Sequence, residues 1–349
     1  MLLSARRAVI ATCTVATFVL LFAFNRLRLA NPTVTSVSPS AEAFGGLVPH
    51  WTTEQENPRF AYVQYATDLD YLCNAMINFA RLDRFATHFN QVLIHPEAWN
   101  EPGSSPEQTF LRNIQKHHPR VHLHPVPTLS TSTGDPTWSK SLTKFHAFAL
   151  TAYTRVLVFD SDALVLNNMD HTFLSPLAPV AVPRAYWLTD PKSSIKDQML
   201  ASHVMLIEPN TGTFNRIMVQ AKESGAFDME VLNALFADSA MVLPHRRYAL
   251  LTGEFRKKDH GLYLAEDPDV EWNAMAEVSR AYLVHFSDWP LPKPWVAHSE
   301  EQWEQALPGC ADDDVSTADR PRCADRFMWT GFYEDYDRDR EAVCGPLMG

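Results

Sequence analysis

From Phe60 onward, the chain alternates short apolar runs with longer amphipathic stretches. Residues 60–66 (FAYVQYA) are typical of a strand, and Thr67-Asp68 then opens a helix that runs through Leu82. Because strands alternate with helices, the pattern predicts an α/β fold whose mostly parallel sheet has helices on both faces. The other elements predicted in this half are strands at 91–95 and 121–127 and helices at 110–118 and 141–153.

Residues 156–159 (VLVF) form a fully apolar run, which is typical of a buried central strand. Asp160, Ser161 and Asp162 follow at once, and a second apolar run precedes two asparagines. In an extended chain, residues i and i+2 point to the same side, so both carboxylates can converge just past the strand. Ligands bind at that end of open α/β sheets. Two carboxylates there suit a hard divalent cation that bridges a diphosphate, although an ordinary solvated turn has the same pattern.

Three further polar residues lie where they could join such a site. Lys144 is near the start of the helix predicted at 141–153, where a solvated surface lysine is the ordinary interpretation. Asp228 precedes the apolar helical stretch 229–236, and its ordinary role is that of an N-cap. His285 ends a predicted strand and would complete an O,O,N ligand set, although such a histidine is more often packed or exposed.

The N-terminal region has a different pattern. Residues 8–24 carry no charge and are flanked by arginines, which predicts a signal-anchor transmembrane helix. A cleaved signal peptide is the alternative, but Asn25 and Arg26 stand where a small-residue cleavage site is needed. We therefore expect a cytosolic tail at 1–7 and a lumenal stem at 25–58.

Composition and charge narrow the choice of function. The 349 residues are 46% hydrophobic, as in an ordinary globular protein, and carry a formal net charge of −11. An acidic chain is a poor non-specific nucleic-acid binder, because such proteins need a basic face. A nucleotide ligand remains compatible with this charge.

The C-terminal segment 299–349 is acidic and rich in cysteine. It holds Cys310, Cys323 and Cys344, which join Cys73 as the four cysteines outside the apolar N-terminal run. Their spacing fits no zinc pattern. One disulfide within the tail suits an oxidising compartment, but the sequence leaves the pairing open.

Two blocks together resemble a known family. Residues 142–173 contain, in order, a helical lysine, a strand, Asp-x-Asp, an apolar run and a further aspartate, and residues 285–295 contain HF and KPW. This arrangement resembles the glycogenin-like glycosyltransferases of family 8, which have the GT-A fold, and especially the fungal Golgi members that transfer N-acetylglucosamine. The resemblance covers residues 60–295, so we expect a catalytic domain at 59–298.

The resemblance implies roles for individual residues. Asp160, Asp162 and His285 match the family's manganese ligands, with Ser161 between the two aspartates. Lys144 and Lys293 match lysines that contact the sugar diphosphate, and Asp228 falls where the family has a carboxylate near the transferred sugar. The uridine would be held by Tyr65, Ala66, Thr67, Asp68 and Tyr71.

The implied function is a metal-dependent, retaining transfer from a UDP-sugar to a glycan or glycoprotein acceptor. The transferred sugar would be N-acetylglucosamine or glucose, and the chain would be a single-pass type II protein of the Golgi membrane. Two positions depart from the family. Asp288 and Trp289 occupy a lengthened loop before Lys293, and residues 201–203 (ASH) replace a common Asn-Ser-Gly.

Two other functions remain as alternatives. A haloacid-dehalogenase-type phosphatase also has an apolar strand before Asp-x-Asp, but its usual Thr or Val is replaced here by Leu164. A non-catalytic, membrane-anchored protein on a transferase-like fold would bind a nucleotide sugar or a glycan without turning it over. The departures at 201–203 and 288 motivate this second alternative.

Overall fold

The computed structural model describes most of the chain after its N-terminal region. The segments predicted as cytosolic tail, transmembrane helix and stem, residues 1–58, lie outside the described part. Within that part, no helix is both long and apolar enough to cross a membrane. Residues Pro58–Gly349 form one compact unit. The described residues are 59–101, 103–131, 140–188, 198–265, 269–310 and 323–348.

The strands form two sheets. The main sheet has seven strands in the order β3-β2-β1-β4-β7-β6-β8, and the smaller one has three in the order β5-β10-β9. The main sheet contains β1 (Phe60–Tyr65), β2 (Asn90–Pro96), β3 (Val121–Val126), β4 (Arg155–Phe159), β6 (Val180–Pro183), β7 (Val204–Ile207) and β8 (Met241–Leu243). The smaller sheet contains β5 (Ala163–Val165), β9 (Leu250–Leu251) and β10 (Leu283–His285).

The helices are of both α and 3-10 type. The α-helices are α2 (Leu69–Arg84), α3 (Pro106–His117), α4 (Thr211–Ser224), α5 (Asp228–Phe236), α6 (His245–Tyr248), α7 (Gly261–Leu264), α8 (Ala274–Arg280), α9 (Glu300–Ala306) and α10 (Ala324–Met348). The 3-10 helices are η2 (Glu97–Asn100), η4 (Ser141–Ala149), η5 (Asp170–Leu174), η6 (Tyr186–Leu188) and η8 (Thr252–Arg256).

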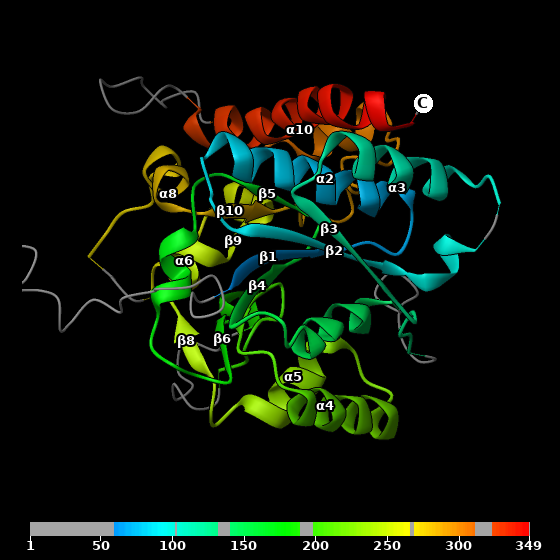
Figure 1. The fold of residues 1–349 in the computed structure, drawn as a ribbon. Coiled ribbons are helices and arrows are strands. Elements are labelled where there is room, and N and C mark those ends of the chain that lie inside the picture. Colours follow the sequence, from blue (N-terminus) through cyan, green and yellow to red (C-terminus); the bar gives the residue numbers. More distant parts are fainter. Residues whose placement is uncertain are drawn as a thin grey trace, which may run out of the picture. The chain divides into compact units, whose positions relative to one another are not determined.

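The main sheet is mostly parallel, as the sequence predicts. β3, β2, β1 and β4 pair in parallel, and so do β6 and β8, whereas β7 runs antiparallel to both of its neighbours. Helices α2, α3 and α10 cover one face, and η4, α4 and α5 lie on the other (Figure 1). The fold is therefore a layered α/β arrangement.

The central strand β4 shows why this sheet is buried on both faces. Val156 and Val158 belong to the hydrophobic core on one face, and Leu157 and Phe159 belong to the core on the other. Successive side chains of a strand point to opposite faces, so an unbroken apolar run fits a strand covered on both sides. The strand predicted at 156–159 is confirmed.

The smaller sheet brings a distant part of the chain to the end of β4. β10 pairs antiparallel with β5, with His285 opposite Ala163, and it pairs in parallel with β9. Since Ala163 directly follows Asp162, this register sets His285 beside the second aspartate of the motif. The backbone N–H of Phe286 donates to the carbonyl of Asp162 at 3.0 Å.

Two segments differ in form from the sequence-based description. The helix predicted at 141–153 is confirmed as the 3-10 helix Ser141–Ala149, which ends four residues earlier than expected. The acidic segment 299–349 contains α9 and the long helix α10, which packs against α2 and α3. Figure 1 shows α10 lying alongside α2 over the sheet.

Candidate functional site

The Asp-Ser-Asp motif, residues 160–162, occupies the short connection between β4 and β5. The backbone N–H of Asp160 donates to the carbonyl of His203 on the neighbouring β7 side at 2.9 Å. Ser161 is buried, and its hydroxyl donates to the carbonyl of Tyr65 at 2.7 Å. These bonds tie the connection to the ends of β1 and β7, so the two aspartates project from a fixed backbone.

Lys144 is the buried cation of the site. Its side chain is 1% exposed, and its Nζ lies 2.5 Å from Asp160 Oδ1 and 2.8 Å from Asp228 Oδ2. The interpretation as a solvated surface lysine is therefore wrong. Burial alone would lower the pKa of Lys144, but Asp160 and Asp228 outweigh burial and raise it, so the amine stays charged.

Asp228 faces this lysine instead of capping its helix. It is the first residue of α5, whose N-cap is Phe227, so the N-cap prediction is wrong. The Oδ2 atom of Asp228 accepts from Lys144 and from the hydroxyl of Ser202 at 2.5 Å. Burial would raise the pKa of Asp228, but Lys144 and Ser202 lower it to about 2, so the carboxylate is ionised at neutral pH.

Asp162 is held by a second basic pair. His285 Nε2 lies 3.1 Å from Asp162 Oδ1, and Lys293 Nζ lies 2.7 Å from Asp162 Oδ2. Lys293 also donates to the carbonyl of Phe286. Burial would raise the pKa of Asp162, but His285 and Lys293 lower it well below its usual range. The structure thus brings the lysine of the lengthened loop to the motif.

The three residues predicted to bind a metal lie together. One ligand atom each from Asp160, Asp162 and His285 falls within 4.8 Å of the others. Ligands at about 2.0–2.2 Å from one ion can be roughly 4 Å apart, so small side-chain shifts would allow all three to share a cation. His285 Nδ1 is buried without a hydrogen-bond partner among the described residues. Two carboxylates and an imidazole fit a divalent cation such as Mn²⁺.

The segment predicted to hold a uridine lies at the end of β1 and the start of α2. Tyr65 and Ala66 are buried, and the Tyr65 ring lies 5.5 Å from Lys144 Nζ. Asp68 caps α2 by accepting from the N–H of Tyr71 at 3.0 Å. The carbonyl of Thr67 accepts from the Lys140 amine at 3.4 Å. This segment therefore adjoins the aspartate motif through Tyr65.

Sequence reasoning missed the part played by Ser202. The segment 201–203 was identified only as a departure from the family pattern, but the Ser202 hydroxyl donates to Asp228. The sequence gave no signal for this contact, because Ser202 and Asp228 are 26 positions apart, with the helix α4 between them. Ser202 lies just before β7, whose first residue, Val204, pairs with Phe159 at the end of β4, and this position beside the motif is the signal that could have identified it.

No protein-family model matches this chain. Individual curated proteins are nevertheless similar to it. The chain is 40% identical over 293 residues to a protein of Gibberella zeae named glucose N-acetyltransferase 1, covering 82% of this chain and 62% of that protein. It is also 40% identical over 307 residues to the Aspergillus fumigatus protein of the same name, covering 83% of this chain and 78% of that protein. The chain thus spans less than two thirds of the Gibberella protein.

Solved structures share the fold at low sequence identity. The bifunctional glycosyltransferase WbbM aligns with a TM-score of 0.53 and 14% identity, over 83% of this chain and 51% of that one. An active-site mutant of LgtC aligns with a TM-score of 0.50 and 14% identity, over 70% of this chain and 94% of that one. Both structures have the GT-A glycosyltransferase fold.

Proposed function

The chain belongs to the glucose N-acetyltransferase 1 family of glycosyltransferases, and from that premise we propose that it transfers a sugar from a UDP-sugar to a glycan or glycoprotein acceptor. The reaction would depend on a divalent cation, with Mn²⁺ as the expected ion. Family membership and fold together remove support from the phosphatase alternative.

The observation that carries this proposal is the pairing of each motif aspartate with a lysine. Lys144 bridges Asp160 and Asp228, and Lys293 pairs with Asp162. In this structure the aspartates neutralise the lysine amines. A bound diphosphate and its cation would change these pairings. The carboxylates would then bind the cation, and the lysine amines would donate to phosphate oxygens.

The chemistry needs the bond between the sugar and the phosphate to break, with negative charge growing on the departing UDP. Lys144 and Lys293 would stabilise that charge from two sides. When bound by Asp160, Asp162 and His285, the divalent cation would supply further positive charge beside the diphosphate. The ionised Asp228 would lie next to the transferred sugar and either position it or act as the nucleophile.

The proposed donor is UDP-N-acetylglucosamine, with UDP-glucose as the second choice. The name of the relatives refers to glucose and to an N-acetyl group. We interpret the two terms together as describing one transferred sugar, N-acetylglucosamine. We also propose retention at the anomeric carbon, which is supported by the family resemblance.

We further propose that the enzyme is a type II protein of the Golgi membrane with a lumenal catalytic domain. The support is the sequence pattern: an apolar stretch at 8–24, flanked by arginines, precedes a Pro- and Ser-rich stretch within 25–58. Two disulfides, Cys73–Cys344 and Cys310–Cys323, suit an oxidising compartment.

The deciding experiment measures UDP release by the purified full chain across a panel of UDP-sugars, with Mn²⁺ and then with EDTA. We expect release from UDP-N-acetylglucosamine that stops with EDTA and returns on adding Mn²⁺. UDP binding without release from any UDP-sugar would instead support the non-catalytic alternative. Release that is unaffected by EDTA would overturn the metal assignment while leaving the transferase assignment intact.

A further inference from the structure

The His285–Lys293 loop, a short irregular segment that begins at the last residue of β10, carries two groups of the proposed donor site at its ends. His285 ends β10, and Lys293 follows eight positions later. Loops move more than strands unless other parts of the chain hold them. Since both side chains must meet Asp162, the position of this loop decides whether that half of the site is assembled.

Asp288, at the middle of this loop, is buried with its carboxylate paired. Only 4% of Asp288 is exposed. Its Oδ1 accepts from Trp329 Nε1 at 3.0 Å, and its Oδ2 accepts from the Tyr333 hydroxyl at 2.8 Å. Arg256 Nη1 lies 3.7 Å from Oδ1 and donates to the Asp288 carbonyl at 2.9 Å.

The next residue, Trp289, indicates that Asp288 is buried because its bonds hold the loop in place. Trp289 is 87% exposed, so the loop turns its acidic side chain inward and its large apolar side chain into solvent. Burying the indole and exposing the carboxylate would be the cheaper arrangement, because a buried charge needs every partner it can find. The fold retains the costly arrangement, and the bonds it forms lead from the loop to α10.

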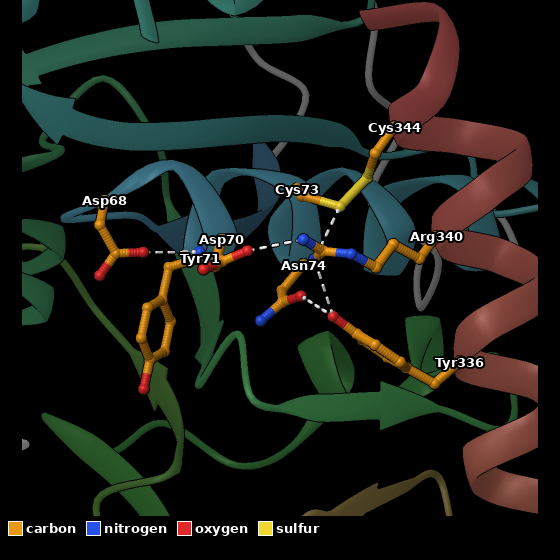
Figure 2. The surroundings of a disulfide bond; sticks show 8 residues. All are labelled: Asp68, Asp70, Tyr71, Cys73, Asn74, Tyr336, Arg340 and Cys344. Carbon is orange, nitrogen blue, oxygen red and sulfur yellow. Dashed lines mark hydrogen bonds and ion pairs between the residues drawn. A yellow bond between two sulfur atoms is a disulfide. The ribbon is translucent and has the colours of Figure 1, made fainter. Parts of the chain in front are cut away.

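Helix α10, which supplies Trp329 and Tyr333, is itself firmly attached to α2. Figure 2 shows the Cys73–Cys344 disulfide and the polar contacts beside it. Arg340 Nη2 lies 2.6 Å from Asp70 Oδ1, and the Tyr336 hydroxyl donates to Asn74 Oδ1 at 2.7 Å. The rings of Tyr333 and Tyr336 also contact Phe286, the residue after His285, at centroid distances of 5.3 and 5.7 Å. A loop bonded to α10 is therefore bonded to the body of the domain.

We propose that Asp288 is a positioning residue, which holds the loop that carries His285 and Lys293 against Asp162 through its bonds to Trp329 and Tyr333 on α10. The inference rests on the proposed function, since it assigns the loop to the donor site. It makes α10, which lies far from the Asp-Ser-Asp motif in sequence, a support of the metal- and diphosphate-binding half of the site.

The chain offers a matched pair of substitutions as a test. Tyr333→Phe removes the hydroxyl that donates to Asp288, and Tyr336→Phe removes one that donates to Asn74 on α2 and accepts from Arg340. Both tyrosines are buried on α10, one turn apart, and both variants keep the aromatic ring. Only the first substitution removes a hydrogen bond to the loop.

Two measurements on the full chain compare Tyr333→Phe with Tyr336→Phe. The first is the Kd of UDP in the presence of Mn²⁺, which we expect Tyr333→Phe to raise about tenfold and Tyr336→Phe to leave within about twofold. The second is amide hydrogen exchange in peptides covering residues 286–293, where the N–H groups of Phe286, Ser287 and Leu291 are bonded. Exchange there should speed up in Tyr333→Phe alone.

A double-mutant cycle completes the test. Asp288→Ala and Tyr333→Phe remove the two ends of one bond, so their effects on the UDP Kd should be strongly non-additive. Equal effects of Tyr333→Phe and Tyr336→Phe in both measurements would overturn the proposal. Absence of UDP binding by the wild-type chain would instead overturn the proposed function, and the exchange comparison would still decide whether Asp288 holds the loop.

Discussion

Lys144 and Lys293 each pair with one aspartate of the same three-residue motif, but different parts of the fold hold them. Lys144 is 1% exposed and lies on η4, against the main sheet, between two carboxylates. Lys293 is 27% exposed and lies on a loop beyond the smaller sheet. One half of the site is thus embedded in the core, and the other half is attached to it through a loop.

The two halves of the site therefore differ in what keeps their charged groups in place. The buried half fixes charges at the end of β4, where any movement would leave an ion unpaired in the core. The loop half is more exposed, and its geometry depends on contacts that α10 makes with Asp288 and Phe286. We therefore expect mutations in the first half to affect folding and catalysis together, and mutations in the second to affect mainly ligand binding.

The largest effect is expected where the two halves meet. Asp162→Ala removes a proposed metal ligand and the partner of both His285 and Lys293. UDP release should fall by about 1,000-fold, because the charge that stabilises the leaving diphosphate is lost. Asp83→Asn, a control on an exposed aspartate of α2, should keep full activity. Activity retained by Asp162→Ala would show that the motif binds no catalytic metal.

The next effect compares the two lysines directly. Lys144→Met leaves Asp160 and Asp228 unpaired in the core, so we expect a loss of about 3 kcal/mol in the free energy of unfolding and about 100-fold in UDP release. Lys293→Met should cost under about 1 kcal/mol of stability but still slow UDP release. Urea unfolding and UDP-release assays measure both quantities. Equal stability losses would contradict the distinction between an embedded and an attached half.

The smallest effect concerns Asp228, whose pKa is lowered from 3.8 to about 2 by Lys144 and Ser202 despite its burial. A lowered carboxyl pKa stabilises the folded state above pH 3.8, and this stabilisation is lost as the pH falls through about 2. Asp228→Asn should therefore cost about 2 kcal/mol at neutral pH.

The pH dependence provides the check on that prediction. The stability difference between wild type and Asp228→Asn should narrow as the pH falls from about 5 towards 2, since the wild-type carboxyl then becomes protonated. Unfolding by urea at several pH values measures this difference. A difference that stays constant with pH would show that Asp228 contributes by packing and not by its charge.

The core of the fold could be predicted from local patterns, because burial of β4 on both faces requires an unbroken apolar run. The Asp-Ser-Asp motif could equally be identified from the sequence, since it directly follows that run. The environment of Lys144 could not be predicted. A lysine is ordinarily solvated, and the carboxylate that completes its burial, Asp228, is 84 residues away.

The loop half was harder to predict for the same physical reason. An acidic residue between serine and tryptophan, such as Asp288, looks like part of a solvated loop until its partners are known. Those partners, Trp329 and Tyr333, lie 41 and 45 residues further along the chain. The pairing of Cys73 with Cys344 spans 271 residues, so no local spacing could identify it.

That last separation also sets the order in which the enzyme is built. Cys73 leaves the ribosome before its partner, which is made 271 residues later. At about 5–20 residues per second, the wait is on the order of half a minute. Lys144 and the Asp-Ser-Asp motif are synthesised well before α10, the helix that holds the His285–Lys293 loop, which is made at the end of this interval. We therefore expect the nascent chain to complete its buried lysine–aspartate cluster, which needs no residue beyond Asp228, before α10 is available to hold the loop.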